Sequence, residues 1–141
     1  MTTFRDRYGL ELTVHVRLTT LEAIQKFCGF NAFKPETWSV IADSPRQQCR
    51  LLYIVTRSAQ QQDALADGKW DQEECEAFVA TMHMQSLEDG LSVFLNELRD
   101  ILPTRQGLLV AEIQERMARL QEQMEAHARL IMWTVNPMKM A

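Results

Sequence analysis

Apolar and polar positions alternate near the start of the chain. Over residues 10–17 every even-numbered residue is apolar and every odd-numbered residue is polar. This period of two, with valine in two of the apolar positions, predicts a half-buried strand. Residues 2–4 are expected to pair back across the Tyr8-Gly9 turn as a short hairpin. Because a lone two-stranded ribbon is marginal in water, the hairpin must pack on helices or on another copy, and its free edge could recruit a partner strand.

Downstream of the strand, apolar residues recur at helical spacing, and capping residues mark where helices begin. Thr19 and Glu22 have capping-box spacing and predict a helix that ends at Gly29. Pro35 suits the first turn of a short helix that runs through Ile41. Ser44 and Pro45 suit the N-cap and first position of the next helix, which runs to about residue 59. That helix is apolar almost all round in its middle, so we expect it to be the central one.

Two more helices are expected before Pro103. One starts at Asp71 and the other at Ser86, each with an acidic residue three positions on. Pro103 ends the second of them. Residues 60–68 are Gln-rich and have weak periodicity, so they are predicted to be a frayed helix end followed by a loop.

The last helix, from about Thr104 to Trp133, has a narrower pattern. Its apolar residues recur in 3-4 spacing, with His127 in one position, and form an a/d seam over three heptads. The remaining surface is polar and includes three Glu–Arg pairs at i, i+4: Glu112–Arg116, Glu115–Arg119 and Glu125–Arg129. A narrow seam on a long polar helix suits contact with another helix, within this chain or in a partner. The apolar seam residues are Val110, Ile113, Met117, Leu120, Met124 and Ile131.

The composition is that of an ordinary globular protein. The 141 residues suffice for one domain, or one domain with an appendage. A net charge of −4 disfavours broad electrostatic binding to nucleic acid or an anionic membrane. No apolar run approaches the roughly 18 residues that span a bilayer. The N-terminus lacks the apolar segment of a signal peptide, so the expected location is the cytoplasm.

Candidate chemistry is sparse. His15, His83 and His127 lack ligand spacing and are predicted to be structural. Spacing alone leaves Ser-His-Asp and Cys-His sites open, yet no nucleophile elbow, Gly-rich loop or paired-carboxylate motif supports one. We therefore expect no catalytic residue, no cofactor and no metal. The Met-rich C-terminal half is either an adaptable surface for helices or core filling with a loose tail. The chain has three cysteines, which are widely spaced and lie among apolar residues: Cys28, Cys49 and Cys75. They are predicted to be buried thiols.

The order of several short motifs resembles a known family. The motifs are Leu12-Thr13-Val14, Phe27-Cys28-Gly29, Ala42-Asp43-Ser44-Pro45, Leu51-Leu52-Tyr53 and Phe94-Leu95-x-Glu97-Leu98-x-x-Ile101-Leu102-Pro103. This order, over about residues 4–125, resembles the small tail assembly chaperones of tailed phages and prophages, especially a type common in planctomycete genomes.

The resemblance implies a non-enzymatic assembly factor in the host cytoplasm. Such proteins coat the tape measure protein, keep it soluble, recruit tail tube subunits and leave before the virion is complete. The implied partners are the tape measure protein and the tail tube protein. Neither nucleic acid nor a membrane is an expected partner, and the chain could form a homo-oligomer. Two rivals are a structural virion component, such as a tail completion or connector protein, and a small enzyme without a recognisable motif.

Together these patterns predict an α+β fold that is mostly α, with an N-terminal β-hairpin followed by five or six helices, which form a helical bundle and end in a long C-terminal helix. Residues 1–103 form the hairpin and helical domain, and residues 104–141 form the long amphipathic helix and a loose tail. Partner contacts are expected at the hairpin edge and at Ile113, Met117, Leu120 and Met124. The predicted core comprises Leu12, Val14, Leu21, Ile24, Phe27, Leu52, Val55, Phe78, Phe94, Leu95 and Leu98.

Overall fold

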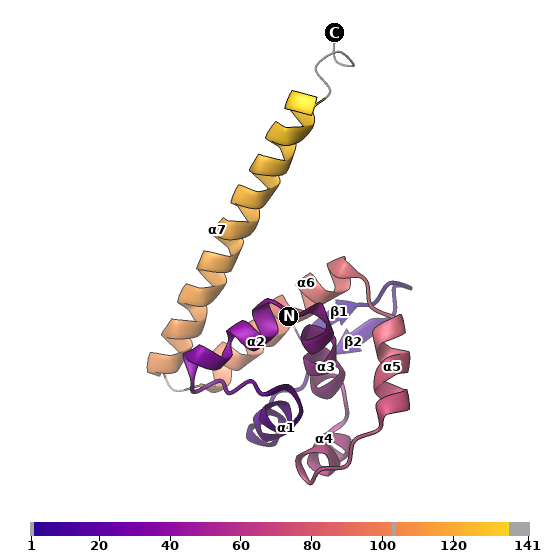
Figure 1. Ribbon diagram of the computed structural model, residues 1–141. Helices are drawn as coiled ribbons and strands as arrows, with labels where there is room; N and C mark the ends of the chain where they lie inside the picture. Colours follow the sequence, from indigo (N-terminus) through magenta and orange to yellow (C-terminus); the bar gives the residue numbers. More distant parts are fainter. Residues whose placement is uncertain (1, 103, 136–141) are drawn as a thin grey trace.

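A computed structural model shows the predicted hairpin followed by helices (Figure 1). It describes the backbone of residues 2–102 and 104–135, and the side chains of residues 2–34, 36–102 and 110–127. The fold is α+β and mostly α, as predicted, with seven α-helices over the described residues. In chain order the elements are β1 (Thr3–Arg5), β2 (Glu11–Thr13), α1 (Leu18–Cys28), the 3₁₀ turn η1 (Pro35–Thr37), α2 (Ser39–Ala42), α3 (Pro45–Val55), α4 (Ala59–Ala66), α5 (Gln72–Ala80), α6 (Met84–Ile101) and α7 (Thr104–Val135).

The hairpin is antiparallel and packs on a helix. Phe4 pairs with Leu12 across the two strands, and β1 lies against α6. The Asp6 carboxylate holds the turn, because it accepts the backbone N–H groups of Tyr8 and Leu10, both at 2.9 Å. Leu10 is therefore part of the turn, and its side chain is exposed. The prediction that the apolar face of the strand begins at Leu10 is wrong; that face begins at Leu12.

The core surrounds α3, which contacts α1, α2, α4, α5 and α6. Most predicted core residues are buried, and Leu12, Phe27 and Leu95 are half-buried against them. Close packing is most evident at Gly90 of α6, where a Cβ atom would lie 2.7 Å from Cδ1 of Leu52. The predicted core residues that are buried are Val14, Leu21, Ile24, Leu52, Val55, Phe78, Phe94 and Leu98.

Capping side chains set several boundaries where the sequence predicts them. Ser44 Oγ accepts a hydrogen bond from a first-turn backbone N–H of α3 at 3.3 Å. Asp71 does the same for α5 at 3.0 Å. Gly29 ends α1 with a φ of +72°, a left-handed conformation that glycine adopts without steric cost. Each of these boundaries follows from chemistry within a few residues of the cap.

The start predicted for α1 is wrong by two residues. The helix begins at Leu18 instead of after Thr19. The hydroxyl that accepts the backbone N–H of Arg17, at 3.0 Å, belongs to Thr20. Thr20 is also fully buried, so this residue, and not Thr19, fixes the entry into the helix.

The start predicted for α6 is also wrong, because the cap is a histidine. Residue Ser86 lies inside the first turn, and the helix begins at Met84. His83 Nδ1 accepts the backbone N–H of Ser86 at 3.0 Å. The imidazole thus takes the place that a hydroxyl or carboxylate usually occupies at an N-cap.

The frayed end and loop predicted for residues 60–68 are in fact a separate helix. The preceding helix ends at Val55, and α4 covers Ala59–Ala66. Ser58 and Gln61 form a capping box: Ser58 Oγ accepts the Gln61 N–H at 3.3 Å, and Gln61 Oε1 accepts the Ser58 N–H at 3.0 Å. The glutamines that weaken the apolar pattern therefore belong to a capped helix.

Gln62 of α4 is fully buried and joins three segments. Its Nε2 donates to the backbone oxygens of His15 at 3.0 Å and Ile54 at 3.1 Å. Its Oε1 accepts the Thr20 hydroxyl at 2.5 Å. Burying an amide is tolerable only when its hydrogen bonds are made, and here they tie α4 to α1, to the end of α3 and to the segment after β2.

Candidate protein-binding surface

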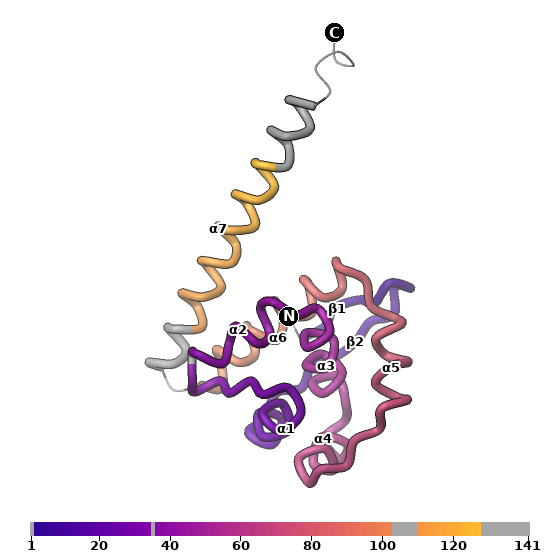
Figure 2. Tube along the Cα trace, in the orientation of Figure 1, coloured from indigo at the N-terminus to yellow at the C-terminus, as the bar shows by residue number. Residues whose placement is uncertain are grey.

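The predicted binding residues lie on α7, which forms a helix hairpin with α6. Gln114 Nε2 donates to Asn96 Oδ1 at 3.1 Å, and Gln121 Nε2 donates to the Glu88 carboxylate. Later residues of α7 thus meet earlier residues of α6, so the two helices are antiparallel. Figures 1 and 2 show α7 extending away from α1, α3, α4 and α5.

The apolar seam of α7 begins inside the domain and continues into solvent. Val110 is buried and Ile113 is half-buried. Met117 is then 42% exposed, Leu120 58% and Met124 65%. We call the three exposed residues the α7 stripe. The structure therefore places the four predicted contact residues on one helix, with Ile113 at the inner end and the stripe beyond it.

The polar flanks of the seam contain two of the three predicted ion pairs. Arg116 bonds Glu112 at 2.8 Å, and Arg119 bonds Glu115. All four side chains are largely exposed, so each pair contributes a few tenths of a kcal/mol at most (roughly). Arg129, the partner predicted for Glu125, lies outside the residues whose side chains are described, as do seam residue Ile131 and the Met-rich tail.

The hairpin, the other predicted contact surface, exposes apolar side chains at its turn. Tyr8 and Leu10 are both exposed there. The turn is held to the body because the Arg7 backbone N–H donates to the Thr81 oxygen at 2.9 Å. Beyond β2, the His15 N–H donates to the Val55 oxygen at 2.8 Å, so the continuation of that strand is bonded to α3. The period-two pattern of residues 10–17 predicts a free strand edge as the contact surface. It does not predict that the apolar side chains at the turn are exposed.

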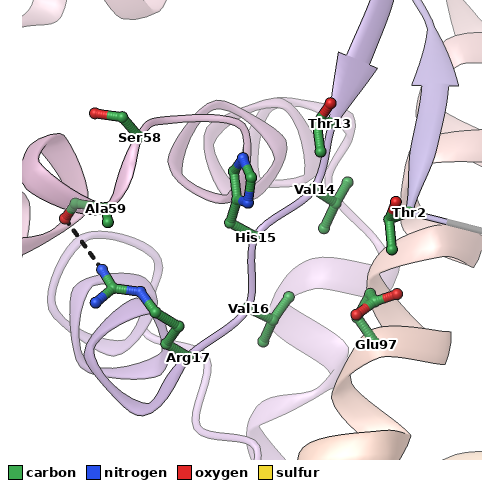
Figure 3. Close-up of a pocket in the computed structure, with 9 residues that line it drawn as sticks. All are labelled: Thr2, Thr13, Val14, His15, Val16, Arg17, Ser58, Ala59 and Glu97. Carbon is green, nitrogen blue, oxygen red and sulfur yellow. Dashed lines mark hydrogen bonds between the residues drawn. The ribbon is translucent and has the colours of Figure 1, made fainter.

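A hollow with a volume of about 620 Å³ lies between the segment after β2, the start of α4 and α6 (Figure 3). His15, Ser58 and Glu97 are among its lining residues. In the described part of the chain, no hydrogen bond joins the His15 side chain to the Ser58 or Glu97 side chain. The Arg17 guanidinium bonds the Ala59 backbone oxygen at 3.0 Å. The lining therefore offers separate polar groups instead of an assembled nucleophile and base.

The three histidines lie apart, as their spacing predicts. His15 lines the hollow, His83 caps α6 and His127 is exposed on α7. Among the side chains that the structure describes, no three His, Cys, Asp or Glu residues come together in an arrangement that would hold a metal ion.

The three cysteines are buried free thiols, as predicted. Burial raises the pKa of Cys28 to about 12 and also raises the pKa of Cys49 and Cys75, because the thiolate loses its hydration. The pKa of Tyr53 rises to about 12, chiefly through burial and then through the nearby Glu74 carboxylate. Raised pKa values keep these groups protonated near neutral pH, which makes the thiols poor nucleophiles.

None of the described helices is both long enough and apolar enough to cross a membrane. Comparison of the chain with models of protein families, with curated proteins and with solved structures finds no match.

Proposed function

We propose that this protein is a tail assembly chaperone of a tailed phage or prophage, which binds the tape measure protein in the host cytoplasm, keeps it soluble and recruits tail tube subunits. The proposal assigns it no enzymatic role. It rests on the ordered motifs of the sequence together with one structural observation: the α7 seam runs out of the core, and its apolar side chains become progressively more exposed from Met117 to Met124.

An exposed seam of this kind is suited to a helical partner. Residues at a and d positions insert between the side chains of a facing helix, and amphipathic helices dock through anchors with this spacing. Methionine adds adaptability, because its unbranched side chain fits irregular apolar surfaces. A long helical protein presents many such segments, so one type of surface could coat it along its length.

The proposal expects a long helical open reading frame beside this gene, and the direct test is co-expression with it, followed by pull-down and light scattering of the soluble fraction. The proposal expects several copies of this chain on each tape measure chain, and an insoluble tape measure when it is expressed alone. If the chain instead persists in purified virions, as detected by mass spectrometry, and does not bind the tape measure, it is a structural component.

Two paired substitutions connect the binding to the α7 stripe. Met117→Glu with Leu120→Glu places two charges on the stripe and should weaken capture of the tape measure at least tenfold, because central apolar anchors carry most of the binding energy. Ala118→Glu with Ala126→Glu adds the same charge at exposed positions of α7 outside the stripe and should bind normally. Because the stripe is exposed, the free energy of unfolding of both variants, measured in urea, should stay within about 0.5 kcal/mol of the parent value. Unfolding of the first pair alone would instead place the stripe in the core.

A further inference from the structure

The histidine cap of α6 joins an exposed ring to a buried backbone group. His83 Nδ1 accepts the Ser86 N–H at 3.0 Å, and the Ser86 hydroxyl oxygen lies 2.6 Å from the same nitrogen. Ser86 is fully buried, whereas His83 is exposed. The imidazole can therefore exchange a proton with solvent, while the residue that it caps is sealed from water.

This cap requires a neutral imidazole. A backbone N–H can only donate, so Nδ1 must lack a proton when it accepts the Ser86 N–H, and the proton of the neutral ring lies on Nε2. A protonated imidazole has an N–H group at both nitrogens and cannot accept. Positive charge is also unfavourable at a helix N-terminus, where the peptide dipoles place their positive ends. Protonation of His83 therefore breaks the cap.

The helices around His83 offer little compensation for a positive ring. On α6, the carboxylates of Asp89 and Glu88 each accept a hydrogen bond from a glutamine side chain. The last turn of α5, residues 77–80, has no charged residue, and α3 meets α6 through the apolar side chain of Leu52. Within the described part of the chain, the His83 ring takes part in no ion pair.

The hairpin, which packs on α6 through β1, is electrically balanced. It carries two arginines, Arg5 and Arg7, and two carboxylates, Asp6 and Glu11. Asp6 accepts two backbone N–H groups of the turn, and Glu11 lies opposite Arg5 in the strand pairing. The hairpin therefore gives no net negative charge that would favour a protonated His83.

The corner that His83 closes also supports the hairpin turn. The Thr81 backbone oxygen, two residues before the cap, accepts the Arg7 N–H at 2.9 Å. That turn exposes Tyr8 and Leu10. Fraying of the first turn of α6 would loosen the segment to which the hairpin turn is bonded.

We propose that His83 is a pH-sensitive cap. The neutral ring closes the first turn of α6 and fixes the corner that holds the hairpin turn, and the protonated ring releases both. The unfolded chain accepts a proton at His83 that the capped helix cannot hold, so the stability due to the cap is present at pH 7.5 and declines as the pH falls towards 5, across the range in which histidines titrate. The role of this cap is independent of the function proposed above.

Urea unfolding of the full chain at pH 7.5 and pH 5.0 tests the proposal. His83→Asn supplies a good N-cap that does not titrate, so the midpoint of the parent should fall by about 0.5 M more than that of His83→Asn between the two pH values. His83→Ala lacks the cap at both pH values; its midpoint at pH 7.5 should be about 0.5 M below that of the parent and should share the weaker pH dependence of His83→Asn. His127→Asn, at an exposed position of α7, should keep the pH dependence of the parent. Equal pH dependence of the parent and His83→Asn would overturn the proposal.

Two local measurements follow the cap directly. Nitrogen NMR of the histidine rings should show the His83 proton on Nε2 at pH 7.5. After correction for intrinsic exchange, hydrogen exchange of the Ser86 N–H should lose about fivefold of its protection between pH 7.5 and pH 5.0 in the parent, and keep it in His83→Asn. A neutral ring with its proton on Nδ1, or Ser86 protection that is the same at both pH values, would show that His83 does not cap the helix in this way.

Discussion

Replacing Gln62 with leucine should destabilise the domain by about 2–3 kcal/mol. Leucine has a similar volume, so the main change is the loss of hydrogen bonds in a buried place. The Ile54 oxygen keeps the Arg57 N–H at 3.2 Å. The Thr20 oxygen still accepts the Arg17 N–H at 3.0 Å, but the Thr20 hydroxyl proton and the His15 oxygen keep only each other, at 3.5 Å. Each group left without a good partner costs roughly 1–1.5 kcal/mol, which gives the expected total.

Urea unfolding followed by circular dichroism measures this effect. For a slope of about 2 kcal/mol/M, Gln62→Leu should lower the midpoint by about 1–1.5 M. Gln60→Leu makes the same chemical change at an exposed position of α4 and should stay within about 0.5 kcal/mol of the parent. A midpoint for Gln62→Leu equal to that of Gln60→Leu would refute the account of the buried network.

A double-mutant cycle tests the bond between Gln62 and Thr20 directly. Thr20→Val removes the hydroxyl and keeps the shape of the side chain. If the 2.5 Å contact is formed, the double variant should be more stable than the sum of the single effects by about 1 kcal/mol, because neither partner is then left alone. Additive effects would show that the two side chains do not interact.

Two further predictions concern close packing and pH. Gly90→Ala should destabilise the domain by about 1 kcal/mol in urea unfolding, because overpacking against Leu52 outweighs the better helix propensity of alanine. Ser92→Ala, at an exposed position of the same helix, should leave the stability unchanged. A Gly90→Ala variant more stable than the parent would contradict the 2.7 Å distance between the added Cβ atom and Leu52 Cδ1. The folded pKa of Cys28, about 12, exceeds its unfolded value of 9.0, so its contribution is complete below pH 9 and is lost as the pH rises from 9 towards 12. Between pH 9 and pH 10 this loss should be about 1 kcal/mol, and Cys28→Ala should reduce the loss, whereas an unchanged pH dependence would contradict the burial of that thiol.

The sequence predicts those boundaries whose cause is local. Ser44, Asp71 and Gly29 each act on backbone groups within one turn, so their positions follow from residue type and spacing. The long last helix is equally predictable, because its 3-4 pattern is sustained. The sequence also identifies the seam residues, although it cannot show that Val110 is buried and Met124 exposed, since this depends on where α7 leaves α6.

The failures arise either where distant residues decide or where an unusual local side chain forms the cap or the turn. α4 contains few apolar residues, and it is stabilised partly by Gln62, whose partners lie in other segments. A buried glutamine has no signature in a hydrophobicity pattern. His83 caps α6 although histidine is not among the usual N-cap residues, so the spacing of Ser86 was misleading. Leu10 is apolar but is drawn into the turn by Asp6.

The contact between the hairpin and α6 has a consequence for synthesis of the chain. A Cβ atom on Gly90 would lie 3.1 Å from Cε2 of Phe4, so the first strand rests on a helix made much later. At about 5–20 residues per second, the ribosome needs on the order of 5–20 s to pass from Phe4 to Gly90. During that interval Phe4 lacks the helix that covers it, and so does Leu52 once it has been synthesised, so the nascent hairpin has no helix to pack on. The contacts of α6 with β1 and α3 therefore form late in translation, and they complete the core of the domain.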